Sequence, residues 1–161
     1  MESLSRRQGL HYTLFRPDEL VLVARPGGRY ARTEQVTPEE LCRIPLVLRE
    51  NGSGTLEVIA AALAGAGLRL VAPPGGGGRG VSQLQVAMRL GTTEGIKAYV
   101  RHSDAMAIVS VISVVDELRS GALRIVDIDN LTLTRDFSFV HAAAEPDSLA
   151  RQFVDFARSD F

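Results

Sequence analysis

With 161 residues, of which 45% are apolar, the chain is long enough to bury the core of one globular domain. Its formal net charge of −1 excludes the strongly basic surface by which many proteins bind nucleic acids. The single cysteine, Cys42, excludes an internal disulfide and any multi-cysteine metal site.

The first half of the chain predicts buried strands followed by helices. Apolar runs fill 10–15 and Leu20–Ala24, and the second run is typical of a buried strand. A short helix is predicted over Pro38–Arg43, because Thr37 precedes a proline and a glutamate follows three residues after this threonine. We expect Cys42 to be a partly buried thiol of this helix. A strand over 46–49 and a helix from Thr55 to about Ala66 complete this half.

A glycine-rich segment, 72–80, separates the two halves of the chain. It holds four consecutive glycines but too few side chains to pack, so we expect a flexible surface loop. A phosphate-binding P-loop needs a lysine and a hydroxyl residue that open a helix directly after the glycines. The segment contains neither feature, which excludes that interpretation.

The second half repeats the alternation of strands and helices. The predicted elements are strand 84–90, helix 93–102, strand 105–109, helix 110–118, strands 123–128 and 133–142, and a final helix that Asp147 caps. Leu149, Phe153 and Phe156 recur at helical spacing in this last helix. The alternation favours a mostly parallel sheet, in which ligands bind at the carboxyl ends of the strands.

Two polar helix starts, about forty residues apart, are the candidate site. Each follows a predicted strand and combines glycine with hydroxyl residues, so free backbone N–H groups and hydroxyls could bind an anion. The candidate ligand-binding residues are Asn51, Gly52, Ser53, Gly54 and Thr55 at the first start, and Thr92 and Thr93 at the second. Alternatively, these hydroxyls only cap their helices; we expect Ser53, Thr55, Thr92 and Thr93 at N-cap positions.

Charged residues flank both helix starts. Arg49 and Lys97 could supply positive charge, although Lys97 is expected on a solvated helix face. Glu50 and Glu94 would need a nucleophile to act as a catalytic acid and base, and none is evident. We therefore predict a receptor with no catalytic residue.

No metal, cofactor or membrane partner is predicted. His11, His102 and His141 are far apart in the sequence and share no metal-ligand spacing. The first eight residues have no signal-peptide core, and no apolar run approaches the roughly 18 to 20 residues of a membrane span. We therefore expect a cytoplasmic protein.

From Asp18 to about Arg158 the chain resembles the effector-binding domain of LysR-type transcriptional regulators. The resemblance rests on the order and spacing of several short segments: 18–23, 37–41, 45–50, 52–55, 90–97, 107–110, 116–118 and 121–123. It implies a type 2 periplasmic-binding-protein-like α/β fold, in which two crossover strands join two subdomains. The effector binds in the cleft between them, where the resemblance places both candidate helix starts.

The resemblance also implies a domain organisation. Residues 1–17 would be an N-terminal extension and first strand, and 18–161 the effector-binding domain. Within it, 25–125 would form a complete second subdomain, while 18–24 and 126–161 would be the remnant of a first subdomain. The last strand and helix have no predicted pairing partner. We expect a chain truncated at its N-terminal side, whether an expression fragment, a mis-assigned start or a truncated gene.

The resemblance implies a bacterial, non-enzymatic sensor of a small anionic metabolite, homo-oligomeric and able to contact DNA only through a winged helix-turn-helix absent from this chain. One alternative is a free-standing solute-binding protein of a transporter. Another is an enzyme similar to prephenate dehydratases, which use a threonine-arginine pair such as Thr134-Arg135. Asp136 stands where those enzymes have phenylalanine. On a strand, we expect this pair to face solvent.

Overall fold

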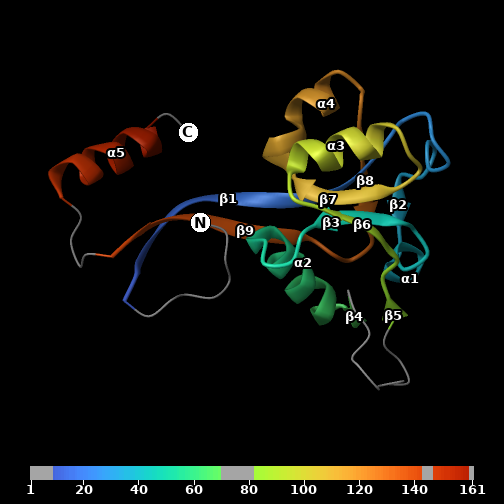
Figure 1. The fold of residues 1–161 in the computed structure, drawn as a ribbon, viewed down its shortest axis with the longest axis horizontal. Helices are drawn as coiled ribbons and strands as arrows, with labels where there is room; N and C mark the ends of the chain where they lie inside the picture. Colours follow the sequence, from blue (N-terminus) through green and yellow to red (C-terminus); the bar gives the residue numbers. More distant parts are fainter. Residues whose placement is uncertain (1–8, 70–81, 143–146, 160–161) are drawn as a thin grey trace.

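The structure of the chain, a computed structural model, describes residues 9–69, 82–142 and 147–159, so the predicted glycine-rich loop 72–80 lies outside the described residues. The colours of Figure 1 follow the chain. In chain order the elements are β1 (His11–Ala24), β2 (Gln35–Val36), α1 (Pro38–Leu41), β3 (Leu46–Arg49), α2 (Gly54–Gly65), β4 (Leu68–Arg69), β5 (Ser82–Gln83), β6 (Val86–Leu90), α3 (Thr93–Arg101), β7 (Met106–Ser110), the 3-10 helix η1 (Val111–Val114), α4 (Val115–Arg119), β8 (Arg124–Ile128), β9 (Leu133–His141) and α5 (Ser148–Ser159).

The main sheet mixes parallel and antiparallel strands. Its order is β2-β8-β1-β7-β3-β6, and β9 also pairs with β1. β3 is parallel to β6 and β7, as the alternation with helices predicts. β1 is antiparallel to β7, β8 and β9, so the prediction of a mostly parallel sheet is wrong around β1. The alternation pattern fixes strand direction only where a helix connects two neighbouring strands.

Strand β1 is longer than predicted and supplies the partner of the last strand. It joins the two apolar runs, 10–15 and Leu20–Ala24, into one strand, with a register shift between Leu14 and Arg16. β8 pairs with the C-terminal end of β1, from Leu22 to Ala24. β9 pairs with the preceding part of β1, from Leu20↔Leu133 to His11↔His141. The prediction that the last strand lacks a pairing partner is therefore wrong.

The local helix signals are largely confirmed. Thr37 and Glu40 form the predicted capping box, with Thr37 Oγ1 accepting from the Glu40 N–H at 3.2 Å and Glu40 Oε2 accepting from the Thr37 N–H at 2.8 Å. Asp147 Oδ1 accepts from the Ala150 N–H at 2.8 Å at the start of α5. The predicted helix over 110–118 is instead divided into η1 and α4.

Two apolar layers lie on opposite faces of the sheet, because successive side chains of β1 alternate between them. Leu20 and Leu22 belong to the layer that contains Ile59 and Leu63 of α2. Val21 and Val23 belong to the layer that contains residues of α3. Figure 1 shows α2 on one side of the sheet and α3 with α4 on the other.

Candidate ligand-binding site

The carboxyl ends of three parallel strands meet at one edge of the sheet. β3 ends at Arg49, β6 at Leu90 and β7 at Ser110, and β3 is parallel to both neighbours. α2 begins shortly after β3, and α3 begins shortly after β6. The N-termini of both helices therefore point toward the same edge, where α/β sheets bind ligands.

A cavity of about 250 Å³ lies at this edge. Thr55 of α2 and Thr93 of α3 both line it. Its other lining residues are three arginines, Arg16, Arg49 and Arg135, two serines, Ser110 and Ser113, and the apolar Ile108, Val109, Ile112 and Phe137. The volume is slightly below the roughly 300 to 1,000 Å³ of typical small-molecule sites. Among the residues that the structure describes, the lining contains arginines and no acidic side chain, and guanidinium N–H groups suit a small anion.

The seven predicted site residues do not all lie on the cavity. Thr55 and Thr93 line it, whereas Asn51 and Gly52 form an exposed turn in which Gly52 adopts a φ of +84°. Gly54 is the first residue of α2 and does not line the cavity. Which of the seven contact a ligand stays a prediction.

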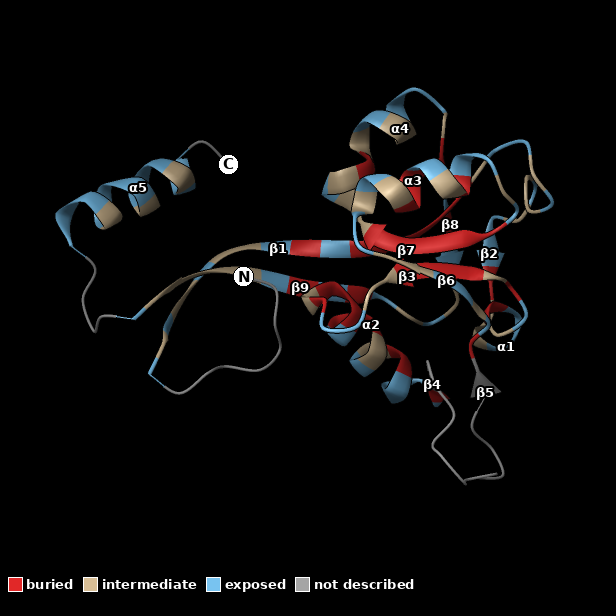
Figure 2. Cartoon of the chain, in the orientation of Figure 1, coloured by how far each residue is buried: buried red, intermediate tan, exposed pale blue. Residues whose placement is uncertain are grey.

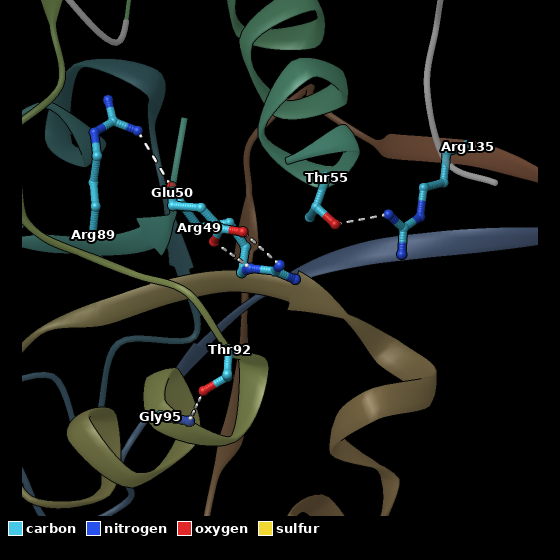
Figure 3. Close-up of polar contacts among 7 residues, drawn as sticks. All are labelled: Arg49, Glu50, Thr55, Arg89, Thr92, Gly95 and Arg135. Atoms are coloured by element: carbon cyan, nitrogen blue, oxygen red, sulfur yellow. Dashed lines mark hydrogen bonds and ion pairs between the residues drawn. The ribbon is translucent and has the colours of Figure 1, made fainter. Parts of the chain in front are cut away.

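Of the four hydroxyl residues predicted at N-cap positions, Ser53 and Thr92 occupy such positions, and only Thr92 makes a capping hydrogen bond with its side chain. Thr92 is the N-cap of α3, and its Oγ1 accepts from the Gly95 N–H at 3.1 Å (Figure 3). Ser53 is the N-cap of α2 and is buried, but its side chain makes no capping hydrogen bond. Thr55 and Thr93 lie inside their helices, so the prediction of N-cap positions is wrong for both.

Arg135 is buried, which corrects the prediction that Thr134-Arg135 faces solvent. Thr134 is exposed, but the side chains of Arg135 and Asp18 are only 4% and 0% exposed. Arg135 Nε and Nη2 both lie 2.7 Å from Asp18 Oδ2. Arg135 Nη1 donates to Thr55 Oγ1 at 2.9 Å (Figure 3), and Ser110 Oγ donates to Asp18 Oδ1 at 2.8 Å. Neither Asp18 nor Ser110 belongs to the candidate site residues that the sequence predicts.

Arg49 and Glu50 form a fork-shaped ion pair beside the cavity. Arg49 Nε donates to Glu50 Oε2 at 2.8 Å and Arg49 Nη2 to Glu50 Oε1 at 2.9 Å (Figure 3). The hydrogen bonds from Arg49 lower the pKa of Glu50 from 4.5 to about 2. Glu50 therefore stays ionised at neutral pH and holds the Arg49 guanidinium at the end of β3.

Lys97 is buried, contrary to the expectation of a solvated face. Its Nζ donates to the Ser113 carbonyl at 3.0 Å and lies 2.8 Å from Glu94 Oε1 and 2.9 Å from Glu117 Oε1. Burial alone would lower the pKa of Lys97, but the hydrogen bonds to Glu94 and Glu117 outweigh it and raise this pKa. Lys97 therefore ties α3 to η1 and α4, and it does not line the cavity.

A second cavity, of about 280 Å³, is lined by parts of β1, β2, β8 and β9. Among the described residues, its lining includes the acidic Glu19 and Asp127 and no basic residue. This charge makes it a poor anion site, so the cavity at the helix starts remains the stronger candidate.

Neither the histidines nor the acidic residues make a metal site in the part of the chain that the structure describes. There, no three His, Cys, Asp or Glu side chains gather where a metal ion could bind. His11 and His141 stack with ring centroids 5.4 Å apart on neighbouring positions of β1 and β9. In the described residues, no helix is long and apolar enough to cross a membrane.

A family model described as the LysR substrate binding domain matches residues 2–161. The chain is 33% identical over 140 residues to the uncharacterized HTH-type transcriptional regulator YeiE of Escherichia coli K12, which covers 86% of this chain and 43% of that protein. It is also 33% identical over 144 residues to the phosphonates import ATP-binding protein PhnC of Anaeromyxobacter dehalogenans 2CP-C, covering 89% of this chain and 26% of that protein. The chain spans less than half the length of these curated relatives.

The solved structures that share the fold include two regulatory domains with bound ligands. The regulatory domain of CcmR from Synechocystis PCC6803, in complex with 2-PG, matches 98% of this chain and 70% of that chain, with a TM-score of 0.76 and 22% identity. The effector-binding domain of QuiR, in complex with shikimate, matches 98% of this chain and 68% of that chain, with a TM-score of 0.75 and 14% identity. The chain therefore belongs to the family of LysR substrate-binding domains and has their mixed α/β, periplasmic-binding-protein-like fold.

Proposed function

We propose that the chain is the sensing domain of a LysR-type transcriptional regulator and binds a small anionic metabolite at the two helix starts. The observation that carries this proposal is the cavity that Thr55 of α2 and Thr93 of α3 share with three arginines. We further propose that Asn51, Gly52, Ser53, Gly54 and Thr92 complete the ligand-binding turns.

The physical chemistry of this site favours an anion. The N-terminus of each helix stabilises a nearby negative charge by about 0.3 to 1 kcal/mol. Each hydrogen bond between a protein donor and a charged ligand group contributes roughly 1.5 to 3 kcal/mol. Arg49, which Glu50 holds at the end of β3, lines the cavity with a guanidinium that can donate a charge-assisted hydrogen bond to an anion.

The ligands of two related domains support a carboxylate. CcmR was solved with 2-PG, which is 2-phosphoglycolate, and QuiR with shikimate. Both molecules carry one carboxylate group and differ in the rest of their chemistry. We propose that a carboxylate is also the group that the helix starts of this chain bind.

In the intact regulator, the ligand would act by differential affinity for two arrangements of the subdomains. We propose that residues 25–125 form one of them and that β1 and β9 connect it to the other. A shift in their relative angle would alter the spacing of the paired DNA-binding domains. We also expect the regulator to be cytoplasmic. We expect it to form a homo-oligomer, which sedimentation velocity at several protein concentrations would detect.

Two alternatives remain distinguishable by experiment. A free-standing solute-binding protein of a transporter would have a signal sequence in its complete reading frame. A prephenate-dehydratase-like enzyme would convert prephenate, yet Arg135 of its candidate threonine-arginine pair is engaged with buried Asp18 while Thr134 is exposed. The pair is thus not presented together at one site, and no observation favours the enzyme.

Isothermal titration of the chain with 2-phosphoglycolate, shikimate and sulfate tests the proposal. We expect saturable binding of at least one anion. Thr93→Val should then weaken binding by about tenfold, because it removes a hydrogen bond to a charged group. Thr132→Val is the matched control, since exposed Thr132 lies at the other cavity.

A second pair of variants tests the charge of the site. Arg49→Gln should weaken binding, while Arg119→Gln should leave it unchanged, because exposed Arg119 lies at the end of α4. A folded chain that binds none of the three anions would contradict the proposal. Equal losses in the site variants and in their controls would contradict the location of the site.

A further inference from the structure

We propose that Arg135 is a positioning residue for the ligand: held by Asp18, it fixes the hydroxyl of Thr55 at the wall of the cavity. The inference rests on the proposed function, because it concerns how the same cavity binds its anion. Arg135 and Thr55 both line this cavity.

Several close contacts hold the Asp18–Arg135 pair in place. Two nitrogens of the guanidinium, Nε and Nη2, lie 2.7 Å from the same carboxylate oxygen of Asp18. The guanidinium carbon also lies 4.8 Å from the centre of the Phe137 ring. Burial excludes competing water, which strengthens each of these electrostatic contacts.

The pair joins four elements around the cavity. Asp18 and Arg135 are register neighbours on β1 and β9. Asp18 accepts from Ser110 at the end of β7, and Arg135 donates to Thr55 in the first turn of α2. A change in the twist of the β1–β9 pair is therefore transmitted directly to the hydroxyl of Thr55.

The chemistry of Arg135 suits this role. Thr55 Oγ1 accepts a hydrogen bond from a cation at 2.9 Å, and this polarises the hydroxyl and strengthens it as a donor. A planar guanidinium can contact Asp18 through one edge and Thr55 through another at the same time. A lysine at position 135 keeps the charge but cannot hold both partners in the same geometry.

A double-mutant cycle on the full chain tests the inference. Binding of 2-phosphoglycolate, shikimate and sulfate is measured by titration for Thr55→Val, Arg135→Lys and the double variant. We expect Thr55→Val to lose about tenfold in affinity and Arg135→Lys about fivefold. If Arg135 acts through Thr55, the double variant loses no more than Thr55→Val alone.

Thr55→Ser supplies the rescue, since serine keeps the hydroxyl that accepts from Arg135, and we expect affinity within about twofold of the unchanged chain. A merely structural role of Arg135 would lower the free energy of unfolding and give losses that add. If Arg135→Lys does not fold, Asp18→Asn combined with Arg135→Gln replaces it in the cycle, because this change removes both buried charges together.

The outcomes separate the two proposals. Binding by the unchanged chain with additive losses in the cycle would overturn this inference and leave the proposed function standing. Absence of binding to all three anions by the folded, unchanged chain would overturn both. Non-additive losses with rescue by Thr55→Ser would support the positioning role.

Discussion

Helices α3 and α5 have the same kind of amphipathic sequence, yet only α3 buries its apolar face. Ile96 and Val100 of α3 are fully buried against the sheet. No residue of α5 is buried (Figure 2). Leu149, on its apolar face, is 75% exposed. Both helices thus carry apolar residues at helical spacing, but only those of α3 are removed from solvent.

The difference follows from how each helix is connected. α3 lies between β6 and β7, two strands that flank β3, so its connections hold it against the sheet. α5 follows β9 beyond the end of the sheet (Figure 1). Its contacts with the β1–β9 pair include Arg158 Nη2, which donates to the Leu14 carbonyl at 2.8 Å, and the rings of Phe139 and Phe153. Periodicity thus predicts that a helix has an apolar face, but topology decides what covers it.

The largest expected effect comes from truncating one apolar side chain in each helix. Ile96→Ala should lower the free energy of unfolding by about 2 to 5 kcal/mol, because it leaves a cavity in a packed layer. Leu149→Ala should change it by less than about 0.5 kcal/mol, because this side chain is exposed. Urea denaturation followed by circular dichroism measures both. A similar loss in the two variants would mean that α5 is packed in solution.

The second effect concerns the polar contacts of α3. Lys97 is the only lysine of the chain. Lys97→Met removes the ammonium group that donates to the Ser113 carbonyl and forms an ion pair with Glu117. We expect the free energy of unfolding to fall by about 2 to 3 kcal/mol. The control is Arg151→Met on exposed α5, where the free energy of unfolding should change by less than about 0.5 kcal/mol.

The Lys97 contribution also predicts a pH dependence. The hydrogen bond from Lys97 is the main cause that lowers the pKa of Glu117 below 4.5, and the pKa of Lys97 is raised above 10.5. The stabilisation is thus complete between these two values. It is lost as pH falls through the lowered pKa of Glu117 or rises through the raised pKa of Lys97. The stability difference between the unchanged chain and Lys97→Met should shrink in acid; a difference independent of pH would contradict the ion pair.

The same contrast between local pattern and topology explains what the sequence could predict. The capping box at Thr37 and the strand before Glu50 depend on neighbouring residues, and both are confirmed. The antiparallel partners of β1 depend on strands more than 80 residues away, and local periodicity does not contain this information. For the same reason the family resemblance, which compares the order of many segments, indicated the fold better than any single element did.

In the candidate site, the helix starts were predictable and their buried partners were not. Thr55 and Thr93 follow strands in a pattern that predicts a helix N-terminus. Arg135 contacts Asp18 only because β9 pairs with β1 across 117 residues. One signal was present: Leu133, Arg135 and Phe137 alternate along one face of a strand, which indicates a half-buried arginine that needs an acidic partner.

The smallest expected effect compares the two helix caps. Thr92 accepts from the Gly95 N–H at the start of α3, and Asp147 accepts from the Ala150 N–H at the start of α5. Loss of an N-cap typically costs about 1 kcal/mol of helix stability. In α3 this cost reduces the free energy of global unfolding, because the helix is part of the core. Thr92→Ala should therefore lower the free energy of unfolding by about 1 kcal/mol.

Helix α5 can fray without exposing the core, so Asp147→Ala should change the free energy of global unfolding by only a few tenths of a kcal/mol. Hydrogen exchange at the amides of α5 should nevertheless accelerate in Asp147→Ala, while the amides of α3 keep their protection. Equal losses of global stability in the two variants would show that α5 unfolds together with the core, and the contrast between the two helices would then be wrong.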